Sequence, residues 1–266
     1  MRAMKSCFRL TVVLGMALLC SSVARAEAGS ADDEFVRRVP LRSGGVFALS
    51  NVNGTVEVGA WEKDEVEIRA RKFTRGNSAD LSRVQIVVDT QPFDQARGKL
   101  GEVSVRTVYP ESEGIDVSVE YLIRVPARVV LRRVETINGS VSVRGVTGSG
   151  LLRSVNGNVE LLDGAGRFDA RSTNGNLRIE LRELPPGSPI SIETVNGSVV
   201  LALPANADAE LDILSMNGDF RSELPVMLNG KLSSHDFRGR LGRGGDVVKV
   251  RTVNGGIRVV EARPTV

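Results

Sequence analysis

The sequence is poor in the residues that enzymes and metalloproteins most often use at their sites. Its 266 residues include two cysteines, one histidine and only 4% aromatic residues. Both cysteines, Cys7 and Cys20, lie in the first 26 residues, which we expect to be removed from the mature chain. A mature chain without thiols cannot form disulfides, Cys-ligated metal sites or cysteine nucleophiles. With His235 as the sole histidine, a multi-histidine metal site is excluded as well.

The basic charge of the sequence comes from its N-terminus. The formal net charge is +3, but residues 1–26 contain four basic and no acidic residues. Subtracting them leaves 35 − 4 = 31 basic against 32 acidic residues, a mature net charge of −1. This balance does not support nucleic-acid binding through bulk charge.

Residues 1–26 have the pattern of a signal peptide. A basic segment precedes an apolar run of 11 residues over 10–20, too short to span a bilayer as a helix. Ala24 and Ala26 then supply small residues at the two positions that a signal peptidase reads, which predicts cleavage after Ala26. The alternative is lipidation at Cys20, which the bulky Leu18 and Leu19 disfavour. No later segment is long and apolar enough to cross a membrane, so we expect an exported protein, periplasmic or extracellular.

The rest of the chain repeats one phrase, apolar-x-(Ser/Thr)-x-Asn-Gly-x-apolar-x-apolar. It occurs seven times, and the turn pairs are Asn53-Gly54, Asn138-Gly139, Asn156-Gly157, Asn174-Gly175, Asn196-Gly197, Asn217-Gly218 and Asn254-Gly255. From Asn138 the asparagines are spaced by 18, 18, 22, 21 and 37 residues. The last interval divides evenly if residues 232–236 form a degenerate copy with Asp236 in its turn.

Each copy is predicted to be a strand, a sharp turn and a second strand, because apolar residues alternate on both sides of Asn-Gly. A second break lies between successive turns, so a unit of about 20 residues is typical of one rung of a β-solenoid. We therefore predict an all-β parallel β-solenoid, and the alternative is a meander of independent hairpins. In stacked rungs we expect the asparagine amides to form a ladder and the glycines to need positive φ. We also expect the Asn254 rung to lie at the open C-terminal end.

The apolar columns of the repeat predict the core. They run through Val141, Val159, Leu177 and Val199 and through the residues two positions further on. The column directly before the turn asparagine is apolar in six of seven copies. We expect the corner to turn this column inward, and the alternative is an exposed apolar stripe used for binding.

Domain organisation follows from where the repeat begins. Residues 27–38 are predicted to be a flexible leader, and residues 39–266 one solenoid domain. Within it, 39–133 holds longer alternating strands and 134–266 the regular repeats. The segment 59–133 lacks the phrase, so it is expected to form either wide rungs or an antiparallel cap.

These repeats resemble the bacterial putative-adhesin family, a group of exported β-solenoid proteins with repeated (Thr/Ser)-x-Asn-Gly copies. The resemblance covers essentially the whole mature chain. It implies a right-handed β-helix-like fold and a setting in the cell envelope or at the cell surface. It carries over no catalytic residues.

Candidate catalytic and metal sites are weak on their residue patterns. His235 and Asp236, with Ser233 and Ser234 nearby, have the residue types of a hydrolase, but adjacent residues of an extended strand point to opposite faces. A glycosidase needs a carboxylate pair in an aromatic-lined groove. The available groups are Asp208, Glu210, Asp212, Asp163, Asp169, Trp61, Tyr109 and Tyr121. The segment 242–246 lacks a calcium repeat and is predicted to be a turn. The nearby basic stretch is predicted to be a solvated loop, and the alternative is contact with an anionic surface; it comprises Arg238, Arg240, Arg243, Lys249 and Arg251.

The sequence therefore predicts a non-enzymatic module without cofactor or metal, which binds an envelope protein or a glycan surface. Two alternatives stay open. One is a carbohydrate-active β-helix enzyme, and the other is an envelope-stress accessory protein that binds a membrane partner.

Overall fold

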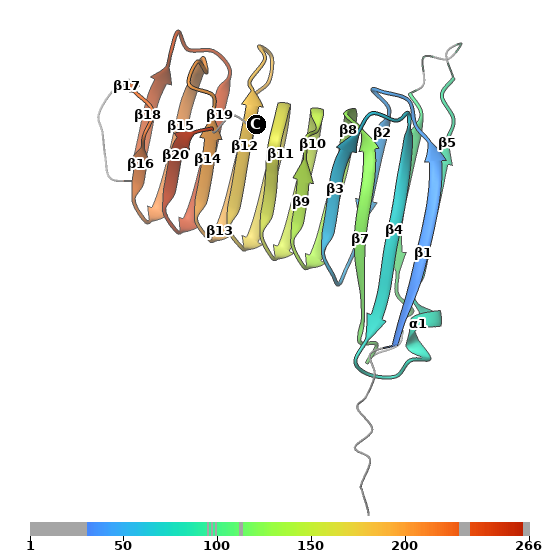
Figure 1. Cartoon of the computed structure of the whole chain (residues 1–266). Helices are drawn as coiled ribbons and strands as arrows, with labels where there is room; N and C mark the ends of the chain where they lie inside the picture. The colour runs from blue at the N-terminus through green and yellow to red at the C-terminus, as the bar shows by residue number, and fades with distance from the viewer. Residues whose placement is uncertain are drawn as a thin grey trace, which may run out of the picture.

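The computed structural model describes residues 31–262 except 95, 97, 99, 112, 113 and 229–234. This part of the chain is all-β: it contains twenty strands and one short helix, α1 (Asp80–Arg83). All the strands join one hydrogen-bonded sheet, which folds over at the Asn-Gly turns into two layers (Figure 1).

We name the layers by their position relative to the turns. The pre-turn layer contains, in spatial order, β5 (Gln85–Gln91), β6 (Glu102–Val108), β2 (Val46–Ser50), β8 (Arg128–Asn138), β10 (Thr147–Asn156), the second half of β11 (Val159–Asn174), β13 (Ile190–Asn196), β19 (Val247–Asn254), β15 (Ala209–Asn217), β18 (Asp236–Leu241) and β17 (Val226–Leu228). The post-turn layer contains β1 (Ala31–Pro40), β4 (Glu65–Thr74), β7 (Val117–Pro126), β3 (Val56–Trp61), β9 (Val141–Arg144), the first part of β11, β12 (Leu177–Glu183), β14 (Val199–Leu203), β20 (Ile257–Glu261) and β16 (Phe220–Ser222).

Successive copies of the phrase pair in parallel and in register. Asn138 is the register partner of Asn156, Asn156 of Asn174, and Asn174 of Asn196. The strands that follow the turns pair in the same way, as Val141, Val159 and Leu177 do. A meander of hairpins would pair the two strands of one copy antiparallel, so that alternative is wrong. The copies stack as rungs, and their turns line up along one rim of the molecule (Figure 1).

The order of the last rungs differs from the order of the sequence. β19, which ends at Asn254, lies between β13 and β15, so the Asn254 rung is interior and the Asn217 rung is the last one. The expectation that Asn254 marks the open end was wrong. Of the degenerate copy predicted at residues 232–236, residues 232–234 lie outside the described residues, and the turn expected at Asp236 was wrong, because Asp236 begins β18, which runs antiparallel to β15. β17 and β18 pair with each other antiparallel instead of adding a rung.

The N-terminal part combines both arrangements left open by the sequence. β6 and β7 pair in parallel with β2 and β3 and extend the stack by one wide rung. β1, β4 and β5 then pair antiparallel and cap this end. The flexible leader predicted over residues 27–38 was wrong where the structure describes it, because Ala31–Pro40 form β1.

The core lies between the two layers. The predicted column of Val141, Val159, Leu177 and Val199 is at most 1% exposed, and the residues two positions further on are fully buried. At roughly 25 cal/mol per Å² of apolar surface buried, each such side chain contributes about 1.5–3 kcal/mol. These columns, repeated in each rung, hold the two layers together and so keep the turns of successive rungs aligned.

Candidate functional site

The most regular surface of the molecule is the rim of turns. We define the turn edge as four residues in each of the seven rungs: the residue before the asparagine, the Asn-Gly pair and the residue after it. The asparagine side chains along it form the predicted ladder. Six amides donate through Nδ2 to the Oδ1 of the neighbouring rung at 2.7–2.9 Å, in the order Asn217, Asn254, Asn196, Asn174, Asn156 and Asn138, and Asn53 accepts the last of these bonds. The ladder follows from parallel stacking, since strands about 4.8 Å apart place identical amides within hydrogen-bond reach.

The turn glycines are needed for close backbone approach more than for their φ angles. Gly54, Gly139 and Gly255 have positive φ, whereas the other four turn glycines do not, which corrects the expectation for those positions. At Gly157 a Cβ would lie 2.0 Å from the carbonyl oxygen of Gly139, and Gly175 and Gly197 repeat this contact with the rung before them. A distance this far below van der Waals contact excludes any side chain unless the rungs separate.

A second ladder runs just inside the first and was not anticipated from the sequence. The Ser or Thr two residues before each turn asparagine is buried, and its hydroxyl donates to the glycine carbonyl of the neighbouring rung. Ser154 donates to Gly139 at 2.7 Å and Ser172 to Gly157 at 2.8 Å. The same bonds are made by Thr136, Thr194, Ser215 and Thr252. The signal was present in the repeat, where this position is Ser or Thr in six of seven copies.

The first rung uses a different side chain at this position. Asn51 is buried and donates its amide to the carbonyl oxygens of Gly54 and Val119, and it accepts from the Thr107 hydroxyl at 2.8 Å. That hydroxyl also shares a hydrogen bond of 2.7 Å with the Tyr121 phenol. Burial raises the pKa of Tyr121 to about 12, so the phenol keeps its proton at neutral pH and cannot act as a base. Asn51, Thr107 and Tyr121 thus replace the Ser or Thr hydroxyl at the first rung, where the hydroxyl ladder ends.

The column before the turn asparagine faces outward, contrary to the expectation that the corner would bury it. Ile137 is 44% exposed, Val195 40% and Met216 57%, while Val52, Val155 and Val253 are half-buried. We call these six residues the apolar stripe. The tight Asn-Gly turn produces this orientation, because the Ser or Thr one residue earlier already points inward and successive side chains alternate.

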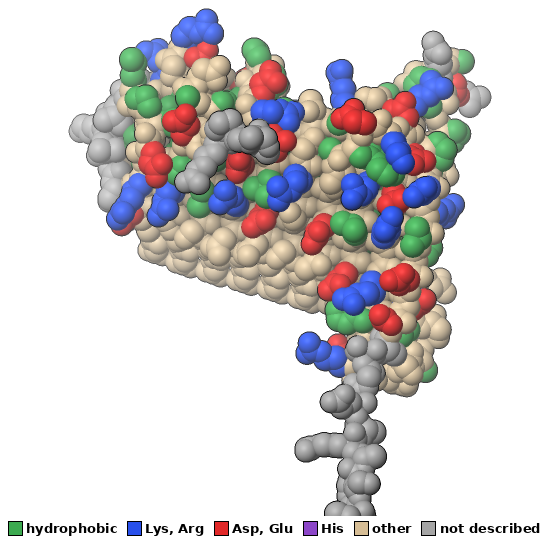
Figure 2. All heavy atoms as spheres, in the orientation of Figure 1, with side chains coloured by type: hydrophobic (Ala, Val, Ile, Leu, Met, Phe, Trp, Pro, Cys, Tyr) green, Lys and Arg blue, Asp and Glu red, His purple; other side chains and the backbone are tan. Residues whose placement is uncertain are grey.

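The turn edge is also almost free of charge. Of its 28 residues only Asp219, in the last rung, is charged, although 25% of the whole sequence is. Figure 2 shows this rim as a smooth band without acidic or basic side chains, below a face on which both kinds are crowded. An uncharged edge with an apolar stripe is suited to contact with a neutral surface.

The structure describes two of the four hydrolase-type residues predicted from the sequence, His235 and Asp236. Ser233 and Ser234 lie outside the described residues. His235 is exposed and its backbone carbonyl accepts from the Ser215 N–H, while Asp236 contacts Arg238 at 4.0 Å.

Three of the five candidate carboxylates, Asp163, Asp208 and Asp212, are engaged in ion pairs. Asp212 contacts Arg251 at 2.5 Å and Arg238 at 3.7 Å, and Asp163 contacts Arg182 at 3.0 Å. The backbone N–H and guanidinium of Arg243 hold the pKa of Asp208 below its usual value, which keeps this carboxyl ionised. Such groups are poor proton donors for glycoside hydrolysis, which requires a carboxyl with a raised pKa.

The same ion pairs neutralise most of the basic stretch. Arg238, Arg243 and Arg251 pair with aspartates, and Lys249 lies 3.7 Å from Glu193. In the 242–246 segment, the Asp246 carboxylate accepts backbone N–H bonds from Gly187 and Ser188 instead of facing a cation. Within the described residues no cluster of His, Cys, Asp or Glu has the arrangement of a metal site.

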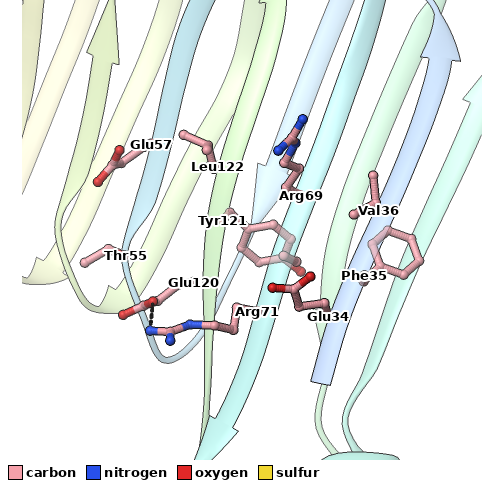
Figure 3. A pocket seen from close by; sticks show the side chains of 11 residues that line it. Glu34, Phe35, Val36, Thr55, Glu57, Arg69, Arg71, Glu120, Tyr121 and Leu122 are labelled. Carbon is pink, nitrogen blue, oxygen red and sulfur yellow. Dashed lines mark hydrogen bonds and ion pairs between the residues drawn. The ribbon is translucent and has the colours of Figure 1, made fainter. Parts of the chain in front are cut away.

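An open groove of about 340 Å³ crosses the outer face of β1, β4, β7 and β3 (Figure 3). Across it Arg71 binds Glu120 at 2.8 Å. Tyr121 contributes to the lining, but Trp61 and Tyr109 do not, so the aromatic residues do not gather into one sugar-stacking cleft. Of its other charged lining residues, Arg69 binds Glu67 outside the groove at 2.8 Å.

The comparisons with known proteins agree with this architecture. No helix among the described residues has the length and apolar character needed to cross a membrane. No curated protein sequence matches the chain. A crystal structure of a putative cell adhesion protein from Clostridium sporogenes is similar in fold, with a TM-score of 0.51 and 12% identity over 87% of this chain and 100% of that one. A putative adhesin from Bacteroides fragilis is 11% identical over 86% of this chain and 97% of its own, with a TM-score of 0.44. The family model described as Toastrack DUF4097 matches residues 49–260, from the first Asn-Gly rung to the last strand, and the chain therefore belongs to this family.

Proposed function

We propose that this chain is an exported, non-enzymatic binding module of the bacterial cell envelope, and that it binds through the turn edge. The single observation that carries the proposal is the apolar stripe, in which Ile137, Val195 and Met216 are 40–57% exposed along an otherwise uncharged rim. Apolar side chains exposed together on one edge often mark a surface used for interaction.

The stacked arrangement makes the turn edge suitable for recognition. Its ladders fix the backbone and the asparagine side chains before any partner arrives, so little conformational entropy is lost on binding. Each donating amide of the ladder uses one N–H on its neighbour and retains a second donor for a partner. The module would thus offer a row of amide groups beside a row of aliphatic side chains, repeated once per rung.

The same proposal includes the organisation expected from the sequence. Residues 1–26 act as a signal peptide, and the rungs wind as a right-handed β-solenoid, the hand that parallel crossovers almost always take. The description of the similar Clostridium sporogenes structure as a putative cell adhesion protein supports a surface role. The partner is an envelope protein or a glycan surface. The apolar stripe favours a protein, and this also keeps the envelope-stress accessory role as the second candidate.

The experiment compares binding by two matched variants. Ile137→Lys with Val195→Lys places two charges on the apolar stripe, whereas Met227→Lys changes a residue that is 63% exposed on β17, away from the turn edge. We expect the stripe variant to lose capture of envelope proteins and binding to a glycan array, and Met227→Lys to retain what the unmodified chain binds. Full binding by a folded stripe variant would place the binding surface elsewhere.

A carbohydrate-active enzyme is tested in the same preparation. Purified protein is incubated with envelope polysaccharides, and reducing ends are measured over time. Release of reducing ends that disappears when a carboxylate is replaced by its amide would overturn the non-enzymatic assignment.

A further inference from the structure

β1 is an open sheet edge at the N-terminal end of the molecule (Figure 1). Among the described strands it pairs only with β4, so one side of its backbone has no partner strand. Its ten residues are paired with β4 in uninterrupted register, with no proline before the last position. The edges at the other end, β16 and β17, have three residues each. A long, regular edge strand is a template for pairing with another chain.

The charges of β1 are divided along its length. Asp32, Asp33 and Glu34 occupy the first half, and Arg37 and Arg38 follow after two apolar residues. We propose that β1 docks against β1 of a second copy of this chain, antiparallel, to form a two-fold symmetric dimer with a continuous post-turn layer.

The symmetry selects the register. Two antiparallel edges related by a two-fold axis must bring residues of the same face opposite each other. Centring the axis on Phe35 places Asp33 opposite Arg37 of the second copy and Asp32 opposite Arg38. Because the axis repeats each pair, the interface contains four cross-strand pairs of opposite charge. Opposite charges at directly facing positions stabilise a sheet and like charges destabilise it.

Other arrangements lack this match. A parallel arrangement in register places each aspartate opposite itself. Moving the axis by one residue, to Val36, keeps only Glu34 opposite Arg38 and places Phe35 opposite Arg37 and Asp33 opposite Val39. The charges therefore favour the Phe35 register, which has four opposite-charge pairs against two, and such differences give edge strands their specificity.

In a single copy of the chain, the charged side chains of β1 remain accessible to a second copy. Arg37 is exposed and makes no ion pair within the part of the chain that the structure describes. Asp33 is bound to Lys72 at 2.6 Å but its side chain remains 52% exposed, and the Arg38 side chain is 57% exposed while contacting Glu67 at 2.7 Å. Val36, which is 61% exposed on the rim of the groove in Figure 3, would lie diagonally across from its own copy.

The test is a charge exchange between two variants. In the Arg37→Asp dimer each introduced carboxylate would face Asp33 of the other copy, and in the Asp33→Arg dimer each introduced guanidinium would face Arg37, so each variant repels itself. An equimolar mixture restores opposite charges at both positions. Molar mass is measured for the exported chain by light scattering and by sedimentation across a dilution series. Arg258→Asp, at an exposed position on β20 at the far end of the same layer, is the matched control.

We expect the unmodified chain and the control to be dimers, each single variant to have a dissociation constant at least about tenfold higher, and the mixture to form a heterodimer. A monomeric unmodified chain at every concentration, an unchanged dimer in Arg37→Asp, or no assembly in the mixture would each overturn the proposal. Circular dichroism establishes that each variant is folded. If Asp33→Arg unfolds through loss of its Lys72 contact, Asp32→Arg and Arg38→Asp provide the same exchange on the other face of the strand.

Discussion

Replacing Gly157 with alanine tests the stacked turns most directly. The new Cβ would lie 2.0 Å from the carbonyl oxygen of Gly139, so the two rungs must separate by more than 1 Å to reach ordinary contact. Neither can move freely, because Gly157 is also bonded to the next rung through its N–H to Asn174 at 3.0 Å. We therefore expect the change to break hydrogen bonds between neighbouring rungs and not merely to tighten one contact.

The magnitude follows from the bonds that cross this junction. Gly139 N–H to Asn156 O measures 3.0 Å, Ser154 Oγ to Gly139 O 2.7 Å, and the Asn156 amide to Asn138 Oδ1 2.8 Å. At about 0.5–1.5 kcal/mol each, losing all three lowers the free energy of unfolding by about 1.5–4.5 kcal/mol. For a domain of this size the melting temperature should fall by on the order of 10 °C.

Three other glycines provide the comparison. A Cβ at Gly59 would have no atom within 4 Å, so alanine there should not disturb the folded chain. It should leave the free energy of unfolding unchanged or raise it by up to about 1 kcal/mol, because alanine lowers the conformational entropy of the unfolded chain. Gly255 belongs to an interior rung and should lose as much as Gly157. Gly218 meets the Gly255 carbonyl at 2.1 Å, but its rung is the last and can move outward, so its loss should be smaller.

Thermal and urea unfolding of the four alanine variants, followed by circular dichroism, supply the measurement. If Gly157→Ala costs no more than Gly59→Ala, close approach of the turn backbones does not limit these positions. An equal loss at Gly218 and Gly157 would contradict the assignment of the Asn217 rung to the end of the stack.

Four further outcomes are expected. Hydrogen bonds from Arg69 and Arg38 lower the pKa of Glu67 in the folded chain below its usual 4.5. The ionised carboxylate therefore stabilises the fold at pH values above the pKa of the unfolded chain, and this stability is lost as the pH falls through the pKa of the folded chain. Urea midpoints measured from about pH 7 to about pH 3 should therefore fall less steeply in Glu67→Gln than in the unmodified chain. Ser172→Ala removes the donor to a buried carbonyl and should lower the unfolding free energy by about 1–3 kcal/mol in urea denaturation; no change would rule out a structural role for the hydroxyl ladder. His235→Ala should bind partners as well as the unmodified chain, and loss of function in that assay would revive the catalytic alternative. Intact mass of the exported protein should correspond to a start at Glu27, whereas diacylglycerol on Cys20 would show a lipoprotein.

The repeat phrase alone was sufficient to predict the turns and the core. Alternation around Asn-Gly located the strands, and the columns through Val141 and its equivalents are buried as predicted. The asparagine ladder followed as well, because identical residues in stacked rungs are brought to one spacing. These features depend on local conformation and on repetition, which are both visible along the chain.

The order of the rungs and the character of the turn edge depended on the tertiary structure. β19 enters between β13 and β15 because of where the chain returns after the β17–β18 hairpin, and no local pattern in the repeat encodes that return. The turn glycines are required by a carbonyl of the next rung, a contact between residues 18 or more positions apart in the sequence. Likewise, the residue before each asparagine faces solvent because the hydroxyl beside it is bonded inward to a neighbouring rung. The same holds for β1: its polar residues predicted a flexible leader, and only the pairing with β4 shows that they form a strand.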